Sequence, residues 1–293
     1  MSCPRPACNY YGSKWRLAPA IIDMLPAHQC YCEPYGGSMA VLLSKPPSYV
    51  ETYNDLDGEV VSYFRVLRER PEELIRAIEM TPFARTEALG EHPPTEDAVE
   101  LARRFYTRAI QCRGGPTVVG STGWRWERTG NRHKPLIANW NETYHLWAIA
   151  DRLKQVQIEC DEALTVIQRF DWQSTVFYVD PPYPASTRKR WSTTAYRYEM
   201  TDQQHEELAA LLHEIEGMAI VSSYPCALYE RLYHDWHQVR RRVRTQAAKE
   251  ATEVLWVSPR ARAQRYPLLA AIEGEQVAIA RADHSHAPAL WAP

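Results

Sequence analysis

A carboxylate, two prolines and a tyrosine follow one another at Asp180, Pro181, Pro182 and Tyr183, directly after the apolar run 175–179. The run predicts a buried strand, so the motif lies at a strand's carboxyl end, where open α/β sheets bind ligands. The prolines fix two φ angles and hold neighbouring carbonyls outward beside the carboxylate. Two adjacent acceptors can grip an amino group, and the tyrosine can stack on the ring that carries it. A proline-rich turn without chemistry explains these four residues equally well.

Acidic residues also mark the ends of three other predicted strands. Glu33 opens the loop 33–38 after the first strand, Asp55 ends the second, and Asp161 ends the strand before the one that leads to Asp180. Asp55 lies 19 positions after Gly36, near the offset of roughly 20 residues at which dinucleotide-binding folds place an acid for ribose hydroxyls. Each acid alone also fits a helix cap or a turn. Together, the four strand ends favour a ligand site.

The loop after the first strand indicates which kind of ligand this is. Its two glycines, Gly36 and Gly37, allow a ligand to approach the backbone closely, but their spacing is not that of a pyrophosphate-binding loop. Because Glu33 stands just before them, a cationic or zwitterionic ligand fits better than a pyrophosphate. Upstream, the run 10–14 carries Lys14 before a predicted helix, and alone it reads as an exposed lead-in.

Strands and helices alternate at both ends of the chain, which indicates an α/β fold with a mainly parallel sheet covered on both faces. We predict strands at 29–33, 49–53, 156–160, 176–179, 218–222, 236–243 and 253–257. Helices are predicted at 17–25, from 39, at 56–67, 142–153, 163–170, 203–215 and 227–233. The last two strands have no helix between them and are expected to pair antiparallel. From about 71 to 135 the alternation stops, and charged helices at 72–80 and 97–112 precede a segment rich in Gly, Thr, Trp and Arg.

Composition excludes several classes of protein. The 293 residues are 45% hydrophobic and 24% charged, as in ordinary globular proteins, and the net charge of -2 leaves no overall basic footprint for nucleic acid. Seven scattered cysteines lack zinc-site spacing and read as reduced thiols of a cytosolic protein. The chain has no long apolar segment and its start has no signal-peptide core, so we expect no membrane partner and no export.

The order of these motifs resembles a known family. Aromatic-x-Gly-x-Lys at 10–14, Glu-Pro-Tyr-Gly-Gly-Ser at 33–38, Asn-Asp at 54–55, Asp161 and Asp-Pro-Pro-Tyr at 180–183 resemble the Dam-like (class alpha) DNA adenine-N6 methyltransferases. The resemblance extends from residue 10 to about 257. It implies S-adenosylmethionine as methyl donor and a Rossmann-like methyltransferase fold, with a seven-stranded, mostly parallel sheet and an antiparallel last strand.

The resemblance also implies a division into domains. A discontinuous catalytic domain is expected at 1–70 and 136–275, a mainly helical target recognition insert at 71–135, and a flexible tail at 276–293. Two features depart from the usual family pattern. Tyr35 replaces the usual Phe of the glycine-rich loop, and the stretch 184–198 is closer to the phage-associated branch than to the housekeeping enzymes. The recognition sequence therefore cannot be carried over.

Residue roles follow from the resemblance by matching motif positions. Asp55 would bind the ribose hydroxyls, Asp161 the cofactor's adenine amino group, and Asp180 would lie where donor and target meet. The predicted cofactor-binding residues are Tyr10, Gly12, Lys14, Glu33, Pro34, Tyr35, Gly36, Gly37, Asp55, Asp161 and Asp180. The predicted catalytic residues are Asp180, Pro181, Pro182 and Tyr183.

The implied activity is methylation of the 6-amino group of adenine, which must be flipped out of duplex DNA to be reached. The Asp180 carboxylate and the Pro181 carbonyl would accept the two amino hydrogens, and Tyr183 would stack on the purine. Related substrates, the cytosine amino group or adenine in RNA, remain open alternatives. A catalytically silent DNA-binding homologue is a further alternative, whereas the loop spacing argues against a dehydrogenase.

Double-stranded DNA as partner requires local positive charge, which occurs in the insert and after the catalytic motif. The predicted DNA-binding residues are Arg113, Trp124, Arg125, Arg128, Arg132, Lys134, Arg188, Lys189 and Arg190. A further arginine run at 240–244 fits a solvated face as well as a DNA contact. We expect a monomer that needs no metal ion and acts in the cytoplasm of a bacterial or phage-infected cell.

Overall fold

The computed structural model describes residues 5–113, 115, 123–128, 135–187, 196–244 and 250–265. Its strands are β1 (Cys30–Glu33), β2 (Val50–Asn54), β3 (Gln157–Glu159), β4 (Thr175–Val179), β5 (Met218–Ser223), β6 (His237–Arg244) and β7 (Glu250–Val257). They form a seven-stranded sheet in the order β3-β2-β1-β4-β5-β7-β6. The pairs from β3 through β5 are parallel, whereas β7 runs antiparallel to both of its neighbours. The predicted Rossmann-like sheet with an antiparallel last strand is confirmed.

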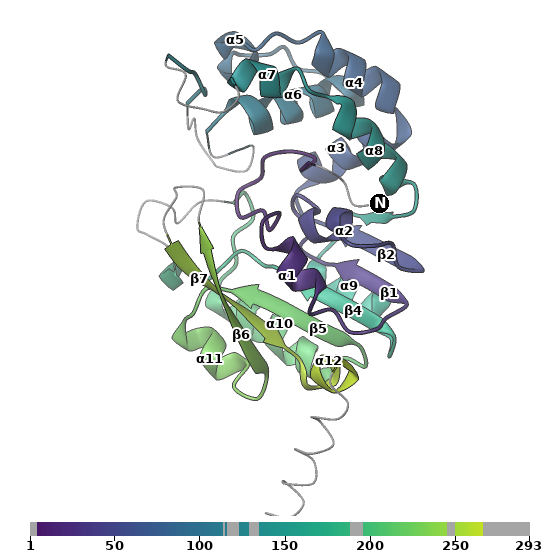
Figure 1. Cartoon of the computed structure of the whole chain (residues 1–293), viewed down its shortest axis with the longest axis vertical. Coiled ribbons are helices and arrows are strands. Elements are labelled where there is room, and N and C mark those ends of the chain that lie inside the picture. The colour runs from purple at the N-terminus through teal and green to yellow at the C-terminus, as the bar shows by residue number, and fades with distance from the viewer. Residues whose placement is uncertain are drawn as a thin grey trace, which may run out of the picture.

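Helices cover both faces of this sheet (Figure 1). The helices that surround it are α1 (Ala18–Ile22), α2 (Ala40–Ser44), α3 (Gly58–Glu69), α9 (Ala163–Phe170), α10 (Asp202–Glu214), α11 (Ala227–Leu232) and α12 (Pro259–Arg265). Side chains alternate along β4, so that Val176 and Tyr178 pack in the cluster that contains α1, α2 and α3. Phe177 and Val179 pack on the opposite face with α9, α10 and α11. The strand is buried on both faces, as expected for the centre of a parallel sheet.

A helical part stands on one side of the sheet, beyond β2 (Figure 1). It comprises α4 (Pro71–Glu79), α5 (Arg85–Leu89), α6 (Ala98–Gln111), α7 (Leu136–Trp140) and α8 (Tyr144–Leu153). The short helices α5, α7 and α12 were not predicted from the sequence, because five to seven residues carry little helical periodicity. Buried residues of α3, α4, α6 and α8 belong to the same cluster as one face of the sheet. The domain boundaries at 71 and 135 stay a prediction, and the proposed tail at 276–293 lies outside the described residues.

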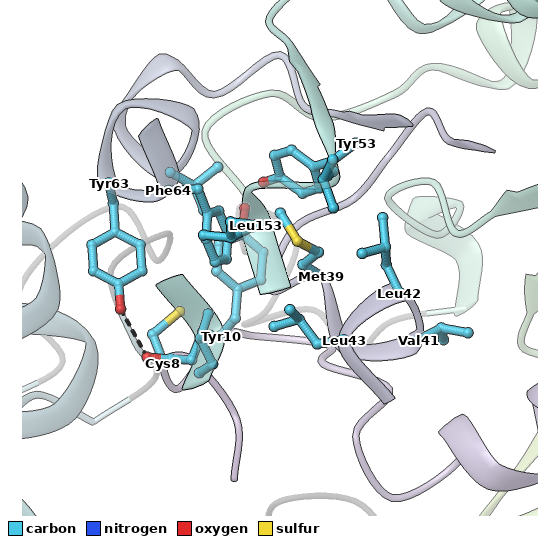
Figure 2. Packing of buried hydrophobic residues seen from close by; sticks show 14 of the residues in the cluster. Cys8, Tyr10, Met39, Val41, Leu42, Leu43, Tyr53, Tyr63, Phe64 and Leu153 are labelled. Carbon is cyan, nitrogen blue, oxygen red and sulfur yellow. Dashed lines mark hydrogen bonds between the residues drawn. The ribbon is translucent and has the colours of Figure 1, made fainter. Parts of the chain in front are cut away.

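The amino-terminal segment is part of the core, contrary to its reading as an exposed lead-in. Tyr10 is buried, and the hydroxyl of Tyr63 in α3 donates a hydrogen bond of 3.0 Å to the carbonyl of Ala7. Figure 2 shows Cys8 and Tyr10 among side chains from α2, β2, α3 and α8. Residues 7–10 therefore pack against α3, the helix that follows β2. This packing fixes the start of the segment that carries Lys14.

Two further sequence expectations concern cysteines and membranes. The six cysteines within the described residues are all free, in agreement with reduced thiols. Among the helices of the described ranges, none combines the length and the apolar character that crossing a membrane requires.

A buried ion triad ties β2 to the helical part. Glu51 of β2 accepts from Lys45 Nζ at 2.5 Å, and its other oxygen lies 2.5 Å from Arg152 Nη1 of α8. All three side chains are at most 8% exposed, and Lys45 also lies 4.5 Å from the centroid of the Tyr31 ring. Since β2 ends at the candidate site, the triad helps to set the position of that strand.

We predict that Glu51→Gln lowers the free energy of unfolding by about 3 to 5 kcal/mol, because it leaves two buried cations without a full anionic partner. Urea unfolding followed by circular dichroism measures this change. Glu91→Gln, at an exposed position, is the matched control and should change stability by less than about 0.5 kcal/mol. Equal stability of the two variants would contradict the role of the triad.

Candidate functional site

A cavity of about 350 Å³ opens at the carboxyl ends of β1, β2, β3 and β4. All predicted cofactor-binding residues line it, namely Tyr10, Gly12, Lys14, Glu33, Pro34, Tyr35, Gly36, Gly37, Asp55, Asp161 and Asp180. Of the predicted catalytic motif, Asp180 and Pro182 line the cavity, whereas Pro181 and Tyr183 lie outside its lining. The structure thus brings together predicted residues that are up to 172 positions apart in the chain, and Asp180 belongs to both predicted sets.

The glycine-rich loop at 33–38 is hydrogen-bonded to the residues at the end of β2. The amide of Gly36 donates to the carbonyl of Asn54 at 2.8 Å, and the amide of Gly37 donates to Asp55 Oδ2 at 2.8 Å. A Cβ atom at Gly36 would lie 2.2 Å from the Tyr53 ring, and Gly37 has a φ of 47°. Glycine is therefore required at both positions, by close approach at one and by backbone conformation at the other.

Asp55 is tied to the backbone around it. Besides the amide of Gly37, its carboxylate accepts a hydrogen bond of 2.9 Å from the amide of Asp57. Burial raises the pKa of Asp55 to about 6, although these backbone donors favour its charged form. Each carboxylate oxygen retains a second lone pair, so the side chain can also accept from ligand hydroxyls.

Glu33 is a buried acid in the wall of the cavity. One of its oxygens accepts from the hydroxyl of Tyr31 and from the amide of Leu42, both at 2.7 Å. Burial raises the pKa of Glu33 to about 8, and these two donors only partly oppose the shift. A positively charged ligand would favour the ionised carboxylate.

Asp161 is held at the rim of the cavity by the side chain of Asn54. The Asn54 amide group donates to the carbonyls of Pro34 and Asp161 at 2.8 and 3.0 Å and accepts from the Asp161 amide at 2.9 Å. It thereby ties together the loops after β1, β2 and β3. The Asp161 carboxylate forms an ion pair of 2.9 Å with Arg169, which lowers its pKa. Asn54 belongs to the Asn-Asp motif at 54–55, but the sequence assigned a role only to Asp55, because the joining of loops from three strands is visible only in the structure.

Asp180 is surrounded by donors. Its Oδ2 accepts from Lys14 Nζ at 2.8 Å and its Oδ1 accepts from the hydroxyl of Ser222 at 2.7 Å, while the hydroxyl of Tyr183, which also contacts Glu253, lies 3.2 Å from Oδ1. Burial disfavours the charged form of Lys14, but the carboxylates of Asp180 and Glu253 outweigh it and raise the pKa of the lysine. Ser222 and Glu253 were missed in the sequence, because they lie within strands and belong to no motif.

A segment beyond β4 closes one side of the cavity. Tyr196 packs edge-on against Tyr11, with 5.4 Å between the ring centroids. Gly12 has a φ of 75°, and a Cβ atom there would lie 2.3 Å from the Tyr196 hydroxyl. Arg197 forms ion pairs with Asp57 at 3.1 Å and with Glu59 of α3 at 3.0 Å. The sequence carried no signal for these contacts, which join positions about 140 to 185 residues apart.

The candidate DNA-binding residues fall in three groups. Residues 111–113 and 123–125 pair as the base of a hairpin, with Arg113 exposed, Arg125 partly buried and Arg128 exposed beyond it. Trp124 packs within the helical part, since its ring lies 5.3 Å from that of Phe83, so DNA contact by this side chain stays a prediction. Arg132, Lys134, Arg188, Lys189 and Arg190 lie outside the described residues.

Comparison with known proteins agrees with this arrangement. The family model for D12 class N6 adenine-specific DNA methyltransferases matches residues 10–247. The chain belongs to this family. It is therefore an adenine-specific DNA methyltransferase, and the resemblance inferred from the motifs is confirmed. Proteins called DNA adenine methylase from Salmonella typhi and from Salmonella typhimurium strain LT2 are each 24% identical to it over 249 residues, which span 80% of this chain and 84% of each relative.

We predict that Glu33→Gln stabilises the protein increasingly as the pH rises. Its carboxyl keeps a proton in the folded protein up to about pH 8 but loses it near 4.5 when unfolded, so the wild type loses stability across that window. The difference in melting temperature, variant minus wild type, should therefore grow between pH 5 and 8.5. At about 1.4 kcal/mol per pKa unit, the change is on the order of 2 to 4 kcal/mol.

Thermal unfolding without ligand, at several pH values, measures this difference. Glu69→Gln at the exposed end of α3 is the matched control and should show no such trend. A difference for Glu33→Gln that is independent of pH would show that the Glu33 carboxyl is already ionised in the folded protein.

Proposed function

We propose that the cavity binds S-adenosylmethionine and that the enzyme methylates the 6-amino group of an adenine flipped out of double-stranded DNA. The observation that carries this proposal is the position of Asp180, which lines the cavity and also heads the Asp-Pro-Pro-Tyr motif. A ligand in the cavity and a base beside the motif would then share this one carboxylate. Extrusion of the base is required because the amino group cannot be reached within a duplex.

The lining of the cavity suits this cofactor. When bound, S-adenosylmethionine supplies an electrophilic methyl group on a positively charged sulfur. Glu33, Asp55, Asp57 and Asp180 give the cavity an acidic lining that matches a cationic ligand. Gly36 and Gly37 line the cavity, and the rings of Tyr53 and Tyr10 occupy the places that their side chains would take, so the loop lies close against the core beside the ligand. We assign ribose binding to Asp55 and recognition of the cofactor's adenine amino group to Asp161.

The residues of the motif would orient the target base. The carboxylate of Asp180 and the carbonyl of Pro181 accept the two amino hydrogens, which directs the nitrogen lone pair away from them. Holding the amino group in this geometry can contribute roughly 7 to 11 kcal/mol to the rate enhancement. Stacking on Tyr183 adds about 1 to 3 kcal/mol of binding. Asp180 also stabilises the positive charge that develops on the nitrogen during transfer.

The helical part is the candidate for DNA recognition. Arg113 in the hairpin base at 111–113 and 123–125 and Arg128 beyond it are both exposed, and arginine can bind guanine edges or phosphates. We therefore assign target recognition to the insert at 71–135. We further propose that one monomer, in the cytoplasm where DNA is accessible, carries both the cofactor cavity and the recognition surface.

We predict that Asp180→Ala lowers the single-turnover rate of methyl transfer at least about a hundredfold, because it removes the acceptor that orients the amino group and meets the developing charge. Cofactor affinity should change less than fivefold. Transfer of tritiated methyl groups to duplex DNA gives the rate, and isothermal calorimetry gives the affinity. Asp151→Ala, at a position where the side chain is 80% exposed, is the matched control. Wild-type rates in Asp180→Ala would refute the assignment, and cofactor binding without methylation by the wild type would support a silent homologue.

We predict that Arg125→Ala or Arg128→Ala weakens DNA binding or alters site preference without affecting folding. Loss of a base contact should cost about 1 to 3 kcal/mol and relax the preference at one position, whereas loss of a phosphate contact should weaken binding to all sequences. Fluorescence anisotropy and sequencing of the methylated sites distinguish these two outcomes. Arg76→Ala, at an exposed position of α4, serves as control. If both arginine variants behave like this control, the hairpin base does not contact DNA.

A further inference from the structure

The strand β7 contributes a buried acid to the catalytic motif. Glu253 is 3% exposed and faces Asp180 from the antiparallel end of the sheet. It accepts a hydrogen bond from the hydroxyl of Tyr183, and Lys14 Nζ lies 3.5 Å from its Oε1. A carboxylate buried to this degree is costly unless it is paired, so its contacts require an explanation.

Lys14 lies between two carboxylates. Its ammonium is 2.8 Å from Asp180, 3.5 Å from Glu253 and 3.0 Å from the carbonyl of Gly12. Its side chain is only 11% exposed, so the ammonium cannot leave the site without losing charged partners in a region of low dielectric constant. The nearer of the two carboxylates is the one that the target adenine needs.

Both carboxylate oxygens of Asp180 already have a donor in this arrangement. Its Oδ1 accepts from Ser222 and its Oδ2 accepts from Lys14, while the Tyr183 hydroxyl, whose single proton is directed mainly to Glu253, lies 3.2 Å from Oδ1. A carboxylate offers about four acceptor positions, so an incoming amino group would compete with these donors. The ammonium is the strongest of them, because its hydrogen bond to the carboxylate is charge-assisted.

We propose that Glu253 is a positioning residue for methyl transfer, which takes over the ammonium of Lys14 when the target amino group binds Asp180 and which fixes the ring of Tyr183 through its hydroxyl. This inference rests on the proposed function. The exchange keeps Lys14 paired throughout, since the second carboxylate is already within 3.5 Å. Without it, the base would have to compete with an ammonium that has no other anionic partner at the site.

The contact with Tyr183 has a separate effect. The ring lies 5.0 Å from Lys14 Nζ on one side and packs edge-on against Tyr224 at 5.0 Å. The hydrogen bond from its hydroxyl to Glu253, with Asp180 Oδ1 3.2 Å from the same oxygen, restricts the position of the ring. A ring held in this way offers the purine a surface of defined orientation, at a lower entropic cost than a mobile one.

Glu253→Gln tests the exchange of the ammonium. Glutamine keeps an oxygen that can accept from Tyr183 but removes the charge that attracts Lys14. We expect the single-turnover rate to fall at least tenfold, while the dissociation constants for S-adenosylmethionine and duplex DNA change less than threefold. Glu214→Gln, at an exposed position near the end of α10, is the matched control and should retain the wild-type rate.

A second substitution distinguishes transfer of the Lys14 ammonium to Glu253 from a purely structural role of Glu253. Adding Lys14→Met to Glu253→Gln removes the ammonium that would otherwise stay on Asp180, so at saturating S-adenosylmethionine the double variant should be at least threefold faster than Glu253→Gln alone. A merely structural role of Glu253 predicts the reverse, because each substitution would add its own damage. A double variant slower than Glu253→Gln would overturn the exchange.

Tyr183→Phe tests the contact with the ring without touching Glu253. It keeps the stacking surface and should lower the rate at least threefold with cofactor affinity unchanged. If Glu253→Gln fails to fold, as judged by circular dichroism, this variant decides the matter, and a full rate in it overturns the proposal. An active wild type with an unaffected Glu253→Gln refutes this inference alone, whereas a wild type that methylates no DNA refutes the proposed function with it.

Discussion

The ion pair between Lys14 and Asp180 is the interaction on which the site depends. It joins the amino-terminal segment to the end of β4, 166 positions later, and places a charge next to the carboxylate that would hold the target. The lysine reaches this place only because the preceding residues are part of the core. Tyr10 is buried, and Tyr63 of α3 binds the carbonyl of Ala7. Packing far from the cavity therefore determines the electrostatics within it.

Burial of acids is the second constraint. Glu33 and Asp55 both have pKa values raised by burial, and each is held by backbone or hydroxyl donors too weak to offset that burial fully. In the free protein, ionisation of these two buried carboxyl groups therefore costs free energy. A cationic ligand relieves this cost, so stability and ligand affinity are coupled through the same side chains. This coupling favours a positively charged cofactor over a neutral analogue of the same shape.

Much of this architecture can be predicted from local sequence, because each prediction needs only neighbouring residues. The runs that became β1, β2, β4 and β5 are short, apolar and followed by turn or motif residues, and the structure places their ends within two residues of the predicted ones. Eight of the eleven predicted cofactor residues follow strand ends, which parallel pairing brings to one edge of the cavity, whereas Tyr10, Gly12 and Lys14 were predicted only from the family resemblance. Short helices such as α5 and α7 were not predicted, since five residues are too few to show the 3.6-residue hydrophobic period of a helix.

The residues that escaped prediction at the site share a different cause. Ser222 and Glu253 lie inside strands, where alternation explains their burial without any reference to chemistry, and only pairing of β5 with β7 shows that both face Asp180. Glu253 lies on an antiparallel strand, to which strand-end reasoning does not apply, whereas Ser222 lies near the carboxyl end of the parallel strand β5 but carries no charge and belongs to no motif. An antiparallel strand turns its amino-terminal half toward the carboxyl edge of its parallel neighbours. That geometry is why a glutamate early in β7, rather than one at its end, can take part in the chemistry.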